Sequence, residues 1–172
     1  MCSFTKQVFA AIAIVAVAAP VVSAQSRRAL ADLGRIDPPS HTAPLQRAGE
    51  PSYVFDDAMK AYDGRQYERA AGILRRFVTV EPDDPAGNFF LAVSLMMTDE
   101  VGEAEDRLNV VVDAGSTPFE FPARFVRAKA WIRLGKLDAA EQELEQVAAS
   151  DDPYARTAAD LLPKVRAQKK RE

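Results

Sequence analysis

Five rows of residues recur along this chain at separations of 34 and then 36, and this internal repeat constrains the fold more than any other feature. One row is Ala70, Ala104 and Ala140. The others are Leu74, Leu108 and Leu144; Ala58, Ala92 and Ala128; Phe77, Val111 and Val147; and Tyr67, Val101 and Leu137. A period of roughly 20 to 50 residues is typical of solenoids, whose units stack on one another. The sequence therefore predicts three stacked units.

Within each unit, apolar residues recur at three and four positions, which is typical of helices, and no alternating pattern predicts a strand. Breakers such as Asp63-Gly64, "EPDDP" from Glu81 and Gly135 separate the periodic stretches. We expect helices over residues 53–63, 67–80, 86–98, 102–114, 122–134, 137–149 and 153–168.

The repeated rows, together with Pro82 at the end of the first unit, resemble the tetratricopeptide repeat family over residues 51–153. The resemblance implies an all-α, right-handed solenoid of antiparallel helix pairs with a C-terminal capping helix. The chain departs from the family early in each first helix, where Val54, Asn88 and Arg124 replace the usual large aromatic residue.

The alanine rows have a physical reason of their own. Paired helices approach to roughly 8–10 Å, and the close end of that range requires small side chains where they cross. We expect these crossings at Ala58 with Ala70, and at the equivalent pairs in the other two units. Ala71 aligns with Glu105 and Glu141, so we expect its row to face outward.

The organisation of the whole chain follows from its composition. Residues 1–24 have one lysine, an apolar run from Val8 to Val22 and small residues at the end, which predicts a signal peptide cleaved after Ala24. An uncleaved membrane anchor is the alternative. Cleavage removes the single cysteine, Cys2, and indicates a periplasmic or secreted protein. We expect a disordered linker over 25–52, with a short helical turn at 28–33. Three repeats follow over 53–84, 85–118 and 119–153. A capping helix and basic tail occupy 154–172, and Pro163 is expected to kink or shorten that helix.

The residues that carry catalysis in other proteins are sparse here. The single histidine, His41, lies in the proline-rich stretch and is expected to be an exposed spectator. The sequence has no glycine-rich phosphate loop and no nucleophile motif, and its acidic clusters fit helix caps and outward faces. We therefore expect a non-enzymatic protein with no cofactor and no metal site. A net charge of −3 disfavours nucleic acid and anionic lipid as partners.

A binding surface for another protein or peptide remains as the expected function, because first helices of such solenoids line a concave face. The resemblance and register place these residues in a concave groove: Phe55, Met59, Tyr62, Phe89, Val93, Met96, Met97, Phe125, Lys129, Ile132 and Arg133. Arg124, Arg127 and Lys136 add positive charge at its third-unit end, which would attract an acidic group.

The ladder formed by Phe55, Phe89 and Phe125 has three possible arrangements. It is open to a ligand, packed between repeats, or covered by the chain's own residues 29–36, which a partner would then displace. The leading hypothesis is an adaptor in a cell-envelope assembly, without stable membrane insertion after signal cleavage. The alternative is a structural subunit that stacks through its repeat ends, and the sequence leaves the oligomeric state and the partner open.

Overall fold

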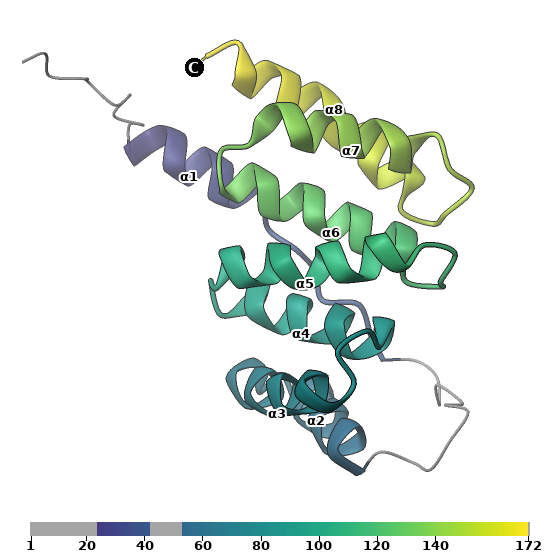
Figure 1. Ribbon diagram of the computed structural model, residues 1–172. Coiled ribbons are helices and arrows are strands. Elements are labelled where there is room, and N and C mark those ends of the chain that lie inside the picture. The colour runs from purple at the N-terminus through teal and green to yellow at the C-terminus, as the bar shows by residue number, and fades with distance from the viewer. Residues whose placement is uncertain (1–23, 42–52, 172) are drawn as a thin grey trace, which may run out of the picture.

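The computed structural model describes residues 24–41 and 53–171, and within them every regular element is a helix. Figure 1 shows that the helices after the first are stacked in chain order, each pair beside the next. They are α1 (Ala24–Leu33), α2 (Tyr53–Asp63), α3 (Tyr67–Val80), α4 (Pro85–Met97), α5 (Val101–Ala114), α6 (Glu120–Arg133), α7 (Leu137–Ala148) and α8 (Ala155–Lys169). The sequence predicted α2 to α8 to within two residues at each end. The expected signal peptide lies almost wholly outside the described residues, so it stays a prediction.

The repeated rows form the core of the solenoid. The six alanines expected at the helix crossings are each 0% exposed, as are Leu74, Leu108 and Leu144. Phe77, Val111 and Val147 are buried as well. Buried side chains of α2 to α5 and some of those of α6 form one cluster, and the other buried side chains of α6, with those of α7, α8 and α1, form a second. The stacking of three units expected from the period is confirmed.

The turn inside each helix pair repeats one hydrogen-bonding pattern. The backbone N–H groups of Gln66, Glu100 and Lys136 donate to the carbonyls five residues earlier, at 2.8, 2.9 and 2.8 Å. The residue before each donor has a positive φ: Arg65 at 56°, Asp99 at 71° and Gly135 at 73°. This is the helix C-terminus of the Schellman type, which favours glycine at the left-handed position. Only the third unit has glycine there, so the first two units hold a side chain in a strained conformation.

The expectation for Ala71 was wrong, because this residue is 1% exposed and belongs to the first core cluster. The aligned residues show why. Glu105 accepts hydrogen bonds from Trp131 and Lys136 of the next unit, both at 2.7 Å, and Glu141 accepts them from Arg166 and Lys169 of α8. The row of Ala71, Glu105 and Glu141 therefore faces the next helices of the stack rather than solvent. Ala71 is the apolar residue of this row.

Two further expectations need correction at the ends of the chain. Of the two effects expected of Pro163, the shortening of α8 does not occur, because the helix continues through Pro163 to Lys169. At the other end, the helical turn expected at 28–33 is part of a longer helix, α1, of 10 residues, and an extended stretch from residue 35 to 41 follows it in the linker that we expected to be disordered. The remainder of that linker, residues 42–52, lies outside the described residues.

We expect Ala70→Leu to lower the free energy of unfolding by about 1–3 kcal/mol, because the larger side chain overpacks a fully buried helix crossing. Urea titration followed by circular dichroism measures this change. The matched control is Ala159→Leu at an exposed position of α8, where we expect a change within about 0.5 kcal/mol. An unchanged Ala70→Leu protein would contradict the crossing.

We expect Arg65→Gly to raise the free energy of unfolding by about 0.5–1 kcal/mol, because glycine adopts the left-handed conformation without the side-chain clash. The same urea titration detects the gain. Arg69→Gly, inside α3, serves as the control and lowers stability by about 1 kcal/mol. Destabilisation by Arg65→Gly would show that the side chain of Arg65 stabilises the turn in another way.

Candidate functional site: the face formed by the first helices

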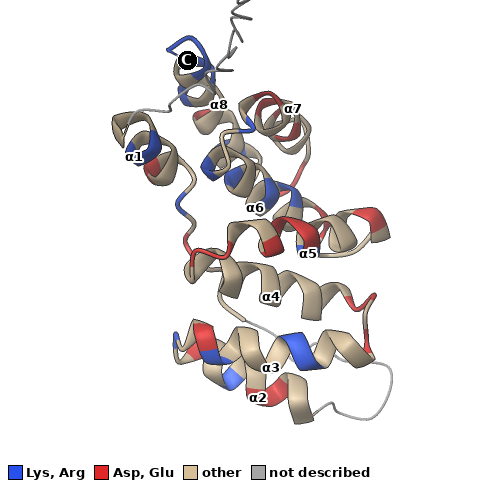
Figure 2. Ribbon diagram, turned by 60° about the vertical axis from the view of Figure 1, so that its left-hand side comes forward, with Lys and Arg blue, Asp and Glu red and all other residues tan. Residues whose placement is uncertain are grey.

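The N-terminal segment, residues 24–41, lies across one side of the solenoid. We call this side the first-helix face, because it is formed by α2, α4, α6 and by α8. Figures 1 and 2 show α1 beside α6, with the chain then running along the stack toward α4. Contacts of α1 are with α6 and α8, whereas the residues that follow reach α4 and α2. The segment therefore spans all the units.

The C-terminal end of α1 is held by α6. Leu30, the buried residue of α1, belongs to the same core cluster as Phe125 and Ile132. The Lys129 ammonium donates to the carbonyl oxygens of Leu33 and Arg35, at 2.9 and 3.0 Å. Burial lowers the pKa of Lys129 from its ordinary value. A cation beside the last carbonyls of a helix is favourable, because these carbonyls carry the negative end of the helix dipole.

Gly34 ends α1 and is the point of closest approach between the segment and α6. Its N–H donates to Leu30 O at 2.8 Å. A Cβ at this position would lie 2.8 Å from the backbone oxygen of Lys129 and would also collide with the Arg133 side chain. The Lys129 oxygen belongs to the helix backbone and cannot move aside. Residue 34 must therefore be glycine if the segment is to lie as it does.

The extended half of the segment is held by the first two units. Ile36 is buried in the cluster that contains Tyr62, Phe90 and Met96. The Tyr62 hydroxyl donates to Pro39 O at 2.9 Å, and burial raises the pKa of this phenol. His41 lies edge-on to Phe90, with ring centroids 5.5 Å apart, so it is a half-buried packing residue rather than the exposed spectator we expected.

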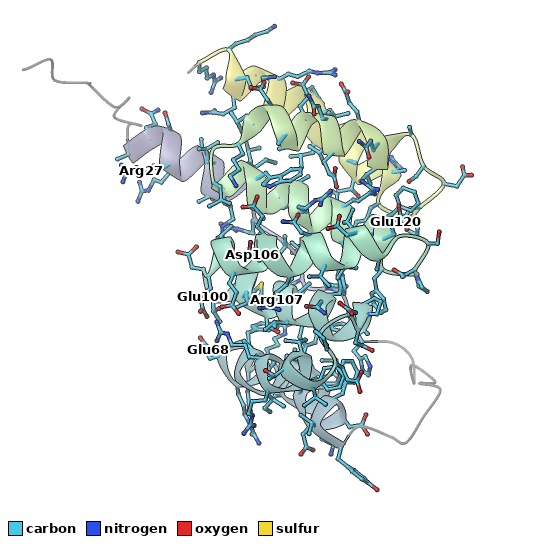
Figure 3. All side chains as sticks on the ribbon, viewed as in Figure 1. Arg27, Glu68, Glu100, Asp106, Arg107 and Glu120 are labelled. Atoms are coloured by element: carbon cyan, nitrogen blue, oxygen red, sulfur yellow. The ribbon has the colours of Figure 1, made fainter. Side chains whose placement is uncertain are left out.

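The hydrogen bonds from Tyr62 and Lys129 have one property in common: their acceptors are main-chain carbonyls of the segment. Such bonds depend on the path of the backbone and not on which side chains it carries. Side-chain identity enters at Leu30, Gly34 and Ile36, where the segment is buried. The opposite side of α1 is polar and exposed, as at Arg27 (Figure 3). The first-helix face thus accommodates a short helix followed by extended chain.

The phenylalanine ladder packs between neighbouring units. Phe55 lies 6.3 Å from Phe90, Phe89 lies 5.2 Å from Phe119, and Phe125 stacks on Tyr154 at 4.7 Å, all between ring centroids. Each ring is at most 6% exposed. The open arrangement considered from the sequence is therefore not the one in this structure. The ladder instead joins each unit to the next, and the segment covers part of the surface beside it.

The other predicted groove residues fall into three groups. Tyr62, Lys129, Ile132 and Arg133 lie at or next to the N-terminal segment, as described above. Met59, Val93 and Met96 are buried in the core, and Met97 is 40% exposed at the end of α4. Sequence reasoning missed Phe90, which contacts His41, because Phe90 stands one position beyond the repeated row. That these residues bind a partner stays a prediction.

The positive charge expected at the third-unit end is largely matched inside the protein. Figure 2 shows basic residues on α6 between acidic residues of α5 and α7. Arg127 pairs with Glu143 at 2.6 Å, Arg124 with Glu120 at 3.2 Å, and Lys136 with Glu105 at 2.7 Å. Arg133 donates to Met96 O at 2.7 Å and pairs with Asp99. Because these arginine and lysine side chains already pair with carboxylates of the protein, the structure does not support the expected attraction of an acidic ligand.

The acidic residues serve mainly as partners of these cations and as caps. Glu100 and Glu103 both pair with Arg75 of α3, at 2.5 and 2.6 Å, and Figure 3 shows Glu100 at the turn between α4 and α5. The hydrogen bonds from Arg75 lower the pKa of Glu103. Asp84 caps α4 by accepting from Gly87 N at 2.6 Å. Several acids expected on outward faces thus join adjacent units.

Among the described residues, none of the helices is long and apolar enough to cross a membrane.

Comparison with known proteins identifies the repeat. Residues 55–117 match the family model described as tetratricopeptide repeat. A search of curated proteins gave no match.

Two solved structures share the fold at low sequence identity. One is the type III secretion translocator chaperone SycD of Yersinia enterocolitica, with a TM-score of 0.61, 15% identity, and coverage of 68% of this chain and 83% of that chain. The other is SycD in complex with a peptide of the translocator YopD, with a TM-score of 0.58, 17% identity, and coverage of 69% and 92%. Residues 55–117 thus carry a tetratricopeptide repeat, and the helical architecture of the chain resembles that of SycD.

Proposed function

We propose that this protein is a protein–protein interaction module that binds a peptide or helix of another protein on its first-helix face. One observation carries the proposal: this face already holds a helix followed by extended chain. The side chains of Tyr62 and Lys129 hold it by donating hydrogen bonds to its backbone carbonyls, and they could donate the same bonds to another chain of this shape. Binding an added helix or extended peptide on a preformed apolar surface is a recurring mode of recognition.

The similarity to SycD supports a peptide as the partner. SycD has been solved with a peptide of the translocator YopD, and its fold resembles this one over about two thirds of the present chain, 69%. The proposed role is therefore non-enzymatic recognition of an extended or helical segment, without nucleic acid and without a cofactor. The finer proposal is an adaptor in a cell-envelope assembly, which rests on the signal-peptide pattern of residues 1–24.

A structural subunit that stacks through its repeat ends is the second candidate. The observation that favours it is the outer edge of the first unit, where Tyr53 and Val80 are 78% and 77% exposed. Light scattering over a hundredfold concentration range separates the two candidates. Self-association that Tyr53→Ser abolishes would favour the subunit, and a monomer throughout would count against it.

We expect a photoreactive residue at position 97 to crosslink in cells to one partner, because Met97 is the exposed member of the predicted site. The matched control is position 106, since Asp106 is exposed on α5 and belongs to a second helix. Mass spectrometry then locates the linked peptide, and a synthetic copy of it should bind the purified protein within about tenfold of the whole partner. Equal crosslinking from both positions, or binding by the folded partner alone, would contradict the proposal.

We also expect the exported protein to begin at or near Gln25, because small residues precede the proposed cleavage after Ala24. N-terminal sequencing of protein recovered from the periplasm or the medium measures this directly. A chain that retains residues 1–24, or that stays in the cytoplasm, would remove the basis for a cell-envelope role.

A further inference from the structure

We infer that the N-terminal segment is a displaceable internal ligand, and that the partner which displaces it presents the same chemistry. That chemistry is a short helix with a leucine four positions before the glycine that ends it, followed by extended chain with a branched aliphatic residue two positions after the glycine. This inference rests on the proposed function. It adds to that function a mechanism of regulation and a description of the partner.

The segment is attached to the solenoid differently from the repeat helices. Each repeat helix buries a continuous row of residues, whereas α1 buries Leu30 alone among its 10 residues. The next anchors are Gly34, Ile36 and the Pro39 carbonyl, separated by exposed residues such as Arg35 and Asp37. A stretch of 18 residues that is buried at only three of them and exposed at half has the low local stability of elements that open without global unfolding.

The partner's chemistry follows from these anchors. The Lys129 ammonium binds the last carbonyl of a helix and the carbonyl two residues further on, whatever the side chains, and the Tyr62 hydroxyl binds a carbonyl of the extended chain. The requirement at position 34 is stricter, because a Cβ there would meet the backbone oxygen of Lys129 at 2.8 Å. Leu30 and Ile36 each place an aliphatic side chain in a core cluster. A partner must supply equivalents of these three residues.

The covalent connection gives the segment an advantage over any free partner. It is joined to the solenoid through residues 42–52, so its binding is intramolecular, with an effective concentration of about millimolar for a short linker. A partner at lower concentration binds only the fraction of molecules whose segment is displaced, and its apparent affinity falls by that fraction. Weakening the segment should therefore raise the affinity for the partner.

The test uses the full chain with Gly34→Ala, compared with the unchanged protein. Gly34 has no positive φ, so alanine is compatible with its backbone and the collision with α6 is the change that matters. Hydrogen exchange followed by mass spectrometry should show at least tenfold faster exchange in residues 24–41, with the protection of α2 to α8 retained. The control is Gly72→Ala in α3, where a Cβ meets nothing within 4 Å and exchange should stay unchanged.

The second measurement uses a synthetic peptide with the sequence of residues 24–41, labelled for fluorescence anisotropy. It should bind the Gly34→Ala chain at least tenfold more tightly than the unchanged chain. The same peptide with alanine at position 34 should bind neither. Ile36→Asp in the full chain acts on the segment at a different anchor and should reproduce the effect of Gly34→Ala.

The outcomes separate the inference from the proposed function. Loss of protection throughout α2 to α8 in both variants would show that the segment is an integral part of the fold, which overturns the inference. Unchanged exchange in both variants would overturn it too, since the segment would not be displaceable. Faster exchange of the segment without binding of the peptide would instead overturn the proposed peptide-binding function of the first-helix face, and with it the partner's chemistry.

Discussion

The close approach of two antiparallel helices is the constraint from which the rest of this structure follows. The six alanines expected at the crossings have no exposed surface, and neither have Leu74, Leu108 and Leu144. A helix pair of this kind cannot bury both of its faces by itself, so it must stack on another pair. Stacking then fixes which residues lie between units, and which side of the stack the first helices form.

The contacts between units combine apolar and ionic groups at equivalent positions. Ala71 fills in the first unit the place that Glu105 and Glu141 take in the next two, and each of those carboxylates receives hydrogen bonds from the following unit. The phenylalanine ladder of the first helices also joins neighbouring units. Most of the side chains that the sequence placed in a groove are therefore buried in the solenoid.

The sequence predicted the fold well because helical periodicity and the repeat are local or near-local patterns. The boundaries of α2 to α8 follow from breakers and apolar spacing that are visible along the chain. The site was harder to predict, because alignment shows that Phe55, Phe89 and Phe125 are equivalent without showing which neighbour covers them. Phe90, one position out of register, and His41, in a stretch without periodicity, contact each other only through the folded chain. The place of α1 depends on contacts such as Leu33 with Lys129, which no local pattern encodes.

The sequence separation of 96 residues between Leu33 and Lys129 has a consequence for the order of assembly. Contacts within and between the repeats join residues that are close in the chain, so they form with little loss of chain entropy. The surface that receives the end of α1 does not exist until the third unit has formed, although α1 precedes every repeat in the chain. The N-terminal segment should therefore dock last, so during each round of folding the first-helix face is transiently uncovered. A newly made molecule would meet its partner most easily in that interval, before its own segment closes over the face.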